Sequence, residues 1–257
     1  MEIAPIHNSP ALGIETDSGR AIAVSDLHLG LASELSDKGI EIPARFPEAK
    51  NRLLDLIQKH DADKLYFLGD IKHNIPITSR EEWEQLPGFF SELSQEAEIE
   101  IIPGNHDGDI EGLIPKNVKL HSAKGKTIAK GKIGLIHGHA WPQKELLKSN
   151  TIIMGHNHPT IELKDDLGGK AKEPAWIRTK LVPEKLPDEL EESVSENPPK
   201  VMIIPAFSKL VGGGAINREL PEDLLGPFFA AGAIDLDNAE AHLLDGTFLG
   251  NLKNIRS

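Results

Sequence analysis

The chain has 257 residues, of which 39% are hydrophobic and 26% charged, a composition typical of a water-soluble globular protein. Its formal net charge of -12 counts against nonspecific, high-affinity binding to nucleic acid, which usually requires a basic surface. No apolar run approaches the roughly 20 residues of a membrane span, the N-terminus does not resemble a secretory signal, and the lack of cysteine excludes disulfides, thiolate zinc sites and a cysteine nucleophile. We therefore expect a cytoplasmic protein with no membrane partner.

The first hundred residues alternate between predicted strands and predicted helices. The strands are predicted over 21–26, 64–68 and 99–102, and the helices over 45–60 and 79–96. Ser79 and Glu82 form a possible capping box for the second helix, and Pro87-Gly88 should interrupt or kink it. This β-α-β-α-β alternation favours a mostly parallel sheet with flanking helices.

After Gly108 the pattern changes to short strands joined by glycine turns, which favours a second, more antiparallel sheet. Strands are predicted over 118–121, 127–130, 132–137, 152–154, 176–181, 201–204, 233–236 and 239–244, and helices over 143–148 and 221–225. The polar segment 164–173 is expected to be a flexible loop. The acidic insertion 183–199 is either a solvated loop or a cap that docks a partner. We expect one domain over 1–257 that includes this insertion.

Five of the predicted strands end in residues that can bind metal ions. The motifs are Asp26-Leu-His28, Gly69-Asp70, Gly104-Asn105-His106-Asp107, His137-Gly-His139 and Gly155-His156-Asn157-His158. Each motif alone is weak, because Gly-Asp and Gly-Asn-His also occur in ordinary turns. However, strands that finish side by side place their following loops on one rim, and seven of the eleven histidines fall in or beside these motifs. The pattern therefore predicts a site for two metal ions.

The five motifs, in this order, resemble those of the calcineurin-like metallophosphoesterase superfamily. The resemblance implies an α/β fold in which two β-sheets pack face to face as a sandwich flanked by helices. It also implies two divalent metal ions, with manganese as the first choice and iron, zinc or nickel as alternatives. In this scheme Asp26, His28 and His158 hold the first ion, Asn105, His137 and His156 hold the second, and Asp70 bridges both.

The same resemblance assigns roles to residues that are not needed as ligands. His106 is expected to be catalytic, by donating a hydrogen bond to the developing charge or a proton to the leaving oxygen. Asp107 either orients a neighbour or caps the following turn. His139 is expected to contact the substrate. The glycine run that begins at Gly212 either approaches the metal rim closely or forms a plain flexible turn.

The residues after Asp70 depart from one branch of the superfamily. Phosphoprotein phosphatases carry G-D-x-x-D-R-G, whereas this chain places His73 in the second aspartate position and lacks the Arg-Gly. A histidine there resembles the SbcD-type double-strand-break repair nucleases and a smaller group of related stand-alone metallophosphoesterases. That resemblance makes Lys72 a substrate-binding residue and His73 a second catalytic residue beside the phosphate. The alternative is a loop pair that faces solvent.

Three functions fit these observations. The first is a metal-dependent phosphodiester hydrolase, specifically a nuclease linked to DNA repair, whose helicase or other repair partner supplies the DNA-binding surface that an acidic chain lacks. The second is a hydrolase of small phosphoesters such as cyclic nucleotides or phosphomonoesters, which the acidic charge favours. The third is a metal-binding scaffold without turnover. Such scaffolds usually lose a metal ligand or the catalytic histidine, and this chain keeps both, which counts against the third function. Between the other two, the histidine at position 73 leads us to favour the first.

Overall fold

The structure, a computed structural model, describes the chain apart from residues 41, 44, 166, 219–223 and 257. Its first sheet consists of β1 (Glu2–Pro5), β2 (Leu12–Thr16), β3 (Gly19–Val24), β4 (Lys64–Leu68), β5 (Glu98–Ile102) and β6 (Lys119–Leu120), which lie in that order. Strands β3 to β6 run parallel, and β1 and β2 add an antiparallel hairpin at one edge. The predicted parallel sheet is therefore present, whereas the edge hairpin was not predicted.

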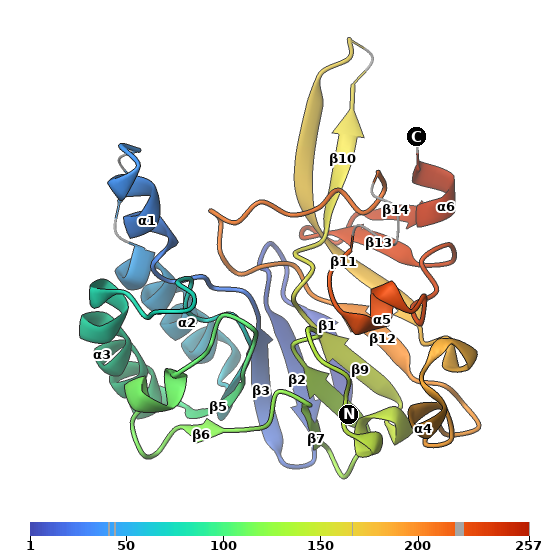
Figure 1. The fold of residues 1–257 in the computed structure, drawn as a ribbon, viewed down its shortest axis with the longest axis horizontal. Helices are drawn as coiled ribbons and strands as arrows, with labels where there is room; N and C mark the ends of the chain where they lie inside the picture. Colours follow the sequence, from blue (N-terminus) through green and yellow to red (C-terminus); the bar gives the residue numbers. More distant parts are fainter. Residues whose placement is uncertain (41, 44, 166, 219–223, 257) are drawn as a thin grey trace.

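Two long helices cover the outer face of this sheet (Figure 1). They are α2 (Arg45–His60) and α3 (Arg80–Glu96), and the short α1 (Leu31–Asp37) precedes them. Leu53 of α2 and Phe90 of α3 are fully buried in one apolar cluster with Phe67 of β4. Each such side chain contributes about 1.5–3 kcal/mol through its burial.

Helix α3 bears out one prediction and corrects another. Ser79 caps its first turn, and the reciprocal bonds between Ser79 and Glu82 form the predicted capping box. Of the two alternatives predicted for Pro87-Gly88, the interruption is wrong, because the helix continues through Pro87 to Glu96, whereas a kink there stays a prediction. Pro87 and Trp83, whose carbonyl loses its helical partner, both lie on the exposed side of the helix. Water can therefore satisfy that carbonyl.

The second sheet has the order β14-β13-β11-β12-β9-β8-β7. Its strands are β7 (Lys126–Ile128), β8 (Ile133–Ile136), β9 (Thr151–Met154), β11 (Lys170–Lys180), β12 (Lys200–Ile203), β13 (Glu240–Leu243) and β14 (Phe248–Asn251), and β10 (Thr160–Lys164) pairs with β11 alone. Strands β8, β9 and β12 are parallel and the other pairs antiparallel, so the sheet is mixed.

The two sheets pack against each other through a shared apolar layer. Leu68 and Ile102 of the first sheet and Leu135, Ile153 and Trp176 of the second are buried in it. A separate cluster covers the outer face of the second sheet. The predicted α/β fold, with a two-sheet sandwich flanked by helices, is thereby confirmed.

Several predictions in the second half differ from the structure. The segment 164–173 is not simply a loop, since Lys164 ends β10 and β11 begins at Lys170; the hairpin projects from the body of the molecule (Figure 1). Segment 143–148 contains the 3-10 helix Lys144–Lys148, and 233–236 makes one isolated bridge rather than a strand. The predicted helix 221–225 lies mostly outside the described residues.

The acidic insertion 183–199 is partly ordered. It contains the 3-10 helix Pro183–Lys185 and α4 (Asp188–Glu191). Leu186 is buried, and Leu190 and Val194 pack on the outer apolar cluster of the second sheet. Its leucines thus tie an otherwise acidic segment to the body of the protein. Of the helices that the structure describes, none is long and apolar enough to cross a membrane.

Candidate metal centre

The five motifs meet where the parallel strands of both sheets end. Within the first sheet, the backbone N–H of Asp26 donates to the carbonyl oxygen of Gly69 at 3.0 Å. Within the second, the N–H of Gly155 donates to the oxygen of His137 at 3.0 Å. The N–H of His156 donates to Asp26 Oδ2 at 3.1 Å and so joins the two sheets. The motifs are therefore brought to one rim, as the sequence predicts.

The backbone at this rim is strained. Five of the seven predicted ligands adopt left-handed φ values between 41° and 73°: Asp26, His28, Asp70, His156 and His158. A residue with a Cβ atom loses about 1–2 kcal/mol in this region. Strain of this kind concentrates at functional sites, where the surrounding structure holds it in place. Here the left-handed residues are the ones whose side chains converge.

Two glycines allow the loops to approach one another. A Cβ atom on Gly104 would lie 2.1 Å from Asp70 Oδ1, and one on Gly69 would lie 2.4 Å from His137 Nδ1. Gly69 also has a φ of 81°. A side chain at either position would displace Asp70 or His137, so the close contact itself requires glycine.

The first group of candidate ligands contains Asp26, His28, Asp70 and His158, with one ligand atom of each within 4.8 Å of the others. His158 Nε2 lies 3.1 Å from Asp26 Oδ1 and 3.3 Å from His28 Nε2. His28 Nε2 lies 3.7 Å from Asp70 Oδ2. These are the residues that the first-ion scheme assigns, together with the proposed bridge.

The second group contains Asp70, His137 and His156, all buried. His137 Nε2 lies 3.0 Å from His156 Nδ1 and 3.4 Å from Asp70 Oδ2. Asp70 belongs to both groups and is the one residue that they share. One carboxylate between two sets of imidazoles is the arrangement needed to hold two cations close together.

The chemistry of these donors fits divalent cations. Oδ1 of Asp26 is buried and, among the described residues, accepts no hydrogen bond of good geometry. Burial lowers the pKa of His28 to about 3, and burial together with the charge of His137 lowers the pKa of His156 to about 4. Both rings are therefore neutral at pH 7 and keep a lone pair for a metal.

His137 differs from these two imidazoles because its pKa is raised, as is that of His158 beside Asp26 despite burial. Burial opposes its protonation, but the hydrogen bond to Asp70 and the charges of Asp26 and Asp70 raise its pKa to about 9. In the absence of a cation, a proton on His137 thus partly balances two buried carboxylates. A bound metal would take the place of that proton, because both require the same Nε2 lone pair.

Backbone carbonyls orient the ligand rings from behind. His137 Nδ1 lies 2.7 Å from the oxygen of Leu68, and His158 Nδ1 lies 3.5 Å from the oxygen of Gly212. A carbonyl partner on one ring nitrogen fixes the tautomer and frees the other nitrogen for a metal. The glycine run from Gly212 therefore lies close to the metal rim, which was one of the two predicted alternatives, the other being a plain flexible turn.

Two predicted residues lie at the margin of the second group. Asn105 is exposed, and none of the contacts described by the structure joins its side chain to Asp70, His137 or His156. His139 packs beside His137, with ring centroids 5.3 Å apart, and its buried Nδ1 has no hydrogen-bond partner among the described residues. Whether Asn105 acts as a ligand and His139 contacts the substrate remains a prediction.

His106 and His73 lie together beside the first group. Their rings stack with centroids 5.6 Å apart, and His106 Nδ1 lies 2.6 Å from the backbone oxygen of His73. The His73 side chain is held between His28, 3.2 Å away, and Glu34 of α1, 3.0 Å away. His106 is half-buried, so part of this residue is exposed at the rim.

Lys72 is placed differently from the expected phosphate contact. Its side chain is fully buried, and its ammonium donates to the carbonyl oxygen of Asn74 at 2.7 Å. A phosphate could reach this ammonium only if surrounding groups moved aside, because the lysine is fully buried. The bridge between Lys72 and Leu29 turns the lysine inward, which the position of Lys72 next to a metal motif did not reveal.

A family model for calcineurin-like phosphoesterases matches residues 19–183, a region that includes all five motifs. The chain belongs to the calcineurin-like phosphoesterase family. This family uses two divalent metal ions, and the two groups of Asp and His side chains described above fit the binding of such ions.

Two solved structures match the chain at low sequence identity, and the first of them shares its fold. The crystal structure of Pseudomonas putida nuclease MPE matches with 17% identity and a TM-score of 0.53, covering 95% of this chain and 98% of that one. The E. coli phosphoesterase Yfce matches with 15% identity and a TM-score of 0.40, covering 90% of this chain and 96% of that one. The first match extends the fold assignment beyond residue 183.

Two buried carboxylates, Glu82 and Asp107, hold the loops of the site in place, and of these only Asp107 had a predicted role, to orient a neighbour or to cap the following turn. Glu82 Oε1 accepts hydrogen bonds from the backbone N–H groups of His73 and Asn74, at 2.8 and 3.0 Å. Asp107 accepts from Ile71 and Lys72 with one oxygen and from Gly104 with the other. The capping box made Glu82 visible in the sequence, but its reach to the His73 loop depends on tertiary packing.

Proposed function

We propose that this phosphoesterase is a phosphodiesterase that cleaves nucleic acid, a nuclease of the group related to the SbcD-type enzymes. The observation that carries the proposal is the place of Asp70 in both ligand groups, with His106 beside them. Two bound cations would supply a hydroxide nucleophile and neutralise phosphate charge. Manganese is our first choice, since carboxylate and imidazole donors suit it.

The residues of the chain itself would orient the substrate phosphate and protonate the leaving oxygen. The carbonyl oxygen of His73 holds the Nδ1–H of His106, which leaves Nε2 free to face the phosphate. With both ring nitrogens protonated, His106 donates through Nε2, either a hydrogen bond to the phosphate or a proton to the leaving oxygen. Glu82 holds the loop at His73, and Asp107 holds the loop after Asp70, each by accepting hydrogen bonds from backbone N–H groups.

Nucleic acid is favoured as substrate by the histidine at position 73, which resembles the SbcD-type nucleases rather than the protein phosphatases. The likeness in fold to a Pseudomonas putida nuclease over nearly the full length agrees with this choice. With a net charge of -12, the chain would rely on a helicase or other DNA-repair partner to hold DNA near the metal centre.

Small phosphoesters are the second candidate. The acidic net charge favours a compact substrate over a long polyanion, and the metal groups would act on either. Cyclic nucleotides and phosphomonoesters are the classes to compare.

The test uses purified protein with added manganese and three substrates: an aryl phosphodiester, an aryl phosphomonoester and end-labelled single-stranded DNA. We expect cleavage of the DNA and of the diester, and loss of both in His106→Ala. Turnover of the monoester alone would contradict the phosphodiesterase proposal. Turnover of both small esters without DNA cleavage would favour the second candidate.

A further inference from the structure

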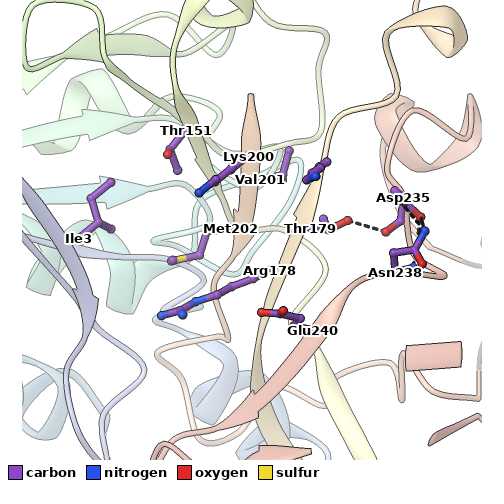
Figure 2. Close-up of a pocket in the computed structure, with 11 residues that line it drawn as sticks. Ile3, Thr151, Arg178, Thr179, Lys200, Val201, Met202, Asp235, Asn238 and Glu240 are labelled. Atoms are coloured by element: carbon purple, nitrogen blue, oxygen red, sulfur yellow. Dashed lines mark hydrogen bonds between the residues drawn. The ribbon is translucent and has the colours of Figure 1, made fainter. Parts of the chain in front are cut away.

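A second concave site lies away from the metal centre. A cavity of about 730 Å³ opens where β11 ends and β9 and β12 begin, and Ile3 of β1 forms part of its wall (Figure 2). The metal ligands follow the other end of β9. The five residue-to-residue steps from Thr151 to His156 span about 16 Å along an extended chain, so the two sites lie at opposite ends of the second sheet.

Three cationic side chains line this cavity: Arg178, Lys180 and Lys200. Lys180 and Lys200 are directly opposite each other in the register of β11 and β12. Like charges in this relation destabilise a sheet. Among the described residues, none forms a hydrogen bond or an ion pair with any of these three side chains. An anion from outside would relieve their repulsion.

Among the described residues, the carboxylates of the cavity form no direct pair with these cations. Asp235 accepts hydrogen bonds from the backbone and side chain of Asn238, at 3.0–3.2 Å. Glu240 faces His242 Nε2 at 3.8 Å. Although Glu240 is the cross-strand neighbour of Arg178, Figure 2 shows the Arg178 side chain extending away from it, toward the side where Ile3 lies.

The arrangement selects one class of ligand. Arg178 and Lys200 point their nitrogen atoms to the same side of the cavity (Figure 2), and Met202 is the cross-strand neighbour of Arg178. A guanidinium fork and two ammonium groups match the several oxygens and the double charge of a phosphate monoester better than the single charge of a carboxylate. The volume exceeds that of a phosphate group, and Ile3 and Met202 offer apolar surface to the rest of the molecule.

We propose that this cavity binds a small molecule through its phosphate group, independently of the metal centre. Binding can be measured by calorimetry on the full chain after metal removal, with adenosine monophosphate and inorganic phosphate as probes and adenosine as the neutral control. Both phosphates should bind and adenosine should not. A tighter complex with the nucleotide would identify a nucleotide site, and equal affinities would identify a site for free phosphate.

The variant Arg178→Gln/Lys200→Gln should weaken binding of both probes roughly tenfold or more, because two charged contacts are lost. The matched variant Lys116→Gln/Lys144→Gln removes the same charge from exposed lysines outside the cavity and should bind normally. His106→Ala should also bind normally, which separates this site from the metal centre. Undetectable binding, equal binding by both double variants, or adenosine binding as well as its phosphate would overturn the proposal.

Discussion

His106 Nδ1 lies 2.6 Å from the backbone carbonyl oxygen of His73. Only the ring N–H can donate in this pair, so the contact fixes the tautomer of His106, with the proton on Nδ1 and the lone pair on Nε2. In the phosphoprotein phosphatase pattern, the aspartate in the position of His73 orients the catalytic histidine. Here the backbone of the same residue supplies the acceptor, and its imidazole contacts His28 and Glu34.

Replacing His106 with alanine should lower kcat by about 10²–10⁴, since a general acid or a charge-stabilising donor is lost. Metal content should not change, because neither ligand group that shares Asp70 includes His106. Steady-state kinetics together with elemental analysis of the variant measure both effects. Loss of one metal ion in His106→Ala would show instead that this histidine is a ligand.

Glu82 should act on turnover through the loop that it holds. Glu82→Gln keeps the size of the side chain but removes the charge that binds the N–H groups of His73 and Asn74. We expect kcat to fall about 10–100-fold with little change in KM, because small displacements of a catalytic group are costly. Glu84→Gln, on the same helix but exposed and, among the described residues, paired with Arg80 alone, is the control.

Glu82 also caps α3, so loss of stability alone would not test its role. The pH profile of kcat adds a readout that capping does not affect, since moving the His73 carbonyl changes the surroundings of His106. A Glu82→Gln protein with reduced melting temperature but unchanged kcat and pH profile would show that the carboxylate serves only the helix.

His73→Ala should impair cleavage of single-stranded DNA more than cleavage of an aryl phosphodiester. His73 contacts Glu34 at the outer side of the site and His28 at the inner side, so it can reach a part of the substrate beyond the reacting phosphate. The ratio of kcat/KM for the two substrates measures the effect. Equal losses on both would argue that His73 supports His28 or His106 rather than nucleic acid.

The ends of the strands that carry the five motifs could be predicted, because metal-binding residues directly follow each hydrophobic run. Helix 45–60 and strand 64–68 match α2 and β4 in the structure. The β1–β2 hairpin was missed, because its strands are short and partly exposed at an edge. Pro87 misled the prediction, since sequence alone does not show that its side of α3 faces solvent.

For the site, the sequence predicted which residues converge but not what holds them. Asp70 was expected between two ligand sets, and the structure brings six of the seven predicted ligands into two groups that share it. The inward turn of Lys72 and the reach of Glu82 follow from how α3 packs on the His73 loop. Such contacts join residues by packing and leave no periodic signal in the chain.

Glu100 should make stability depend on pH. It is 2% exposed in β5; burial opposes its charge, but His121 and Lys126 bond the carboxylate and lower its pKa to about 2. A depressed pKa stabilises the fold above the ordinary value of 4.5, and this contribution is lost as the pH falls toward 2. Glu100→Gln should therefore cost about 1–3 kcal/mol at pH 6.

Urea unfolding of wild type and Glu100→Gln between pH 6 and the acid limit of folding tests this prediction. The difference in free energy of unfolding should shrink as the pH drops below about 4.5, where the unfolded carboxyl takes up its proton. Glu96→Gln, an exposed position on α3, should show no such trend. A constant difference over the whole range would indicate that Glu100 contributes by packing and not by charge.

The shared position of Asp70 is the central claim, and manganese titration of wild type and Asp70→Asn tests it most directly. Calorimetry should give two ions per wild-type chain, and Asp70→Asn should weaken binding of both, because one carboxylate serves both groups. Hydrolysis of every substrate should be abolished in the same variant. If Asp70→Asn binds two ions as tightly as wild type, or turns over normally, Asp70 does not bridge a dinuclear centre.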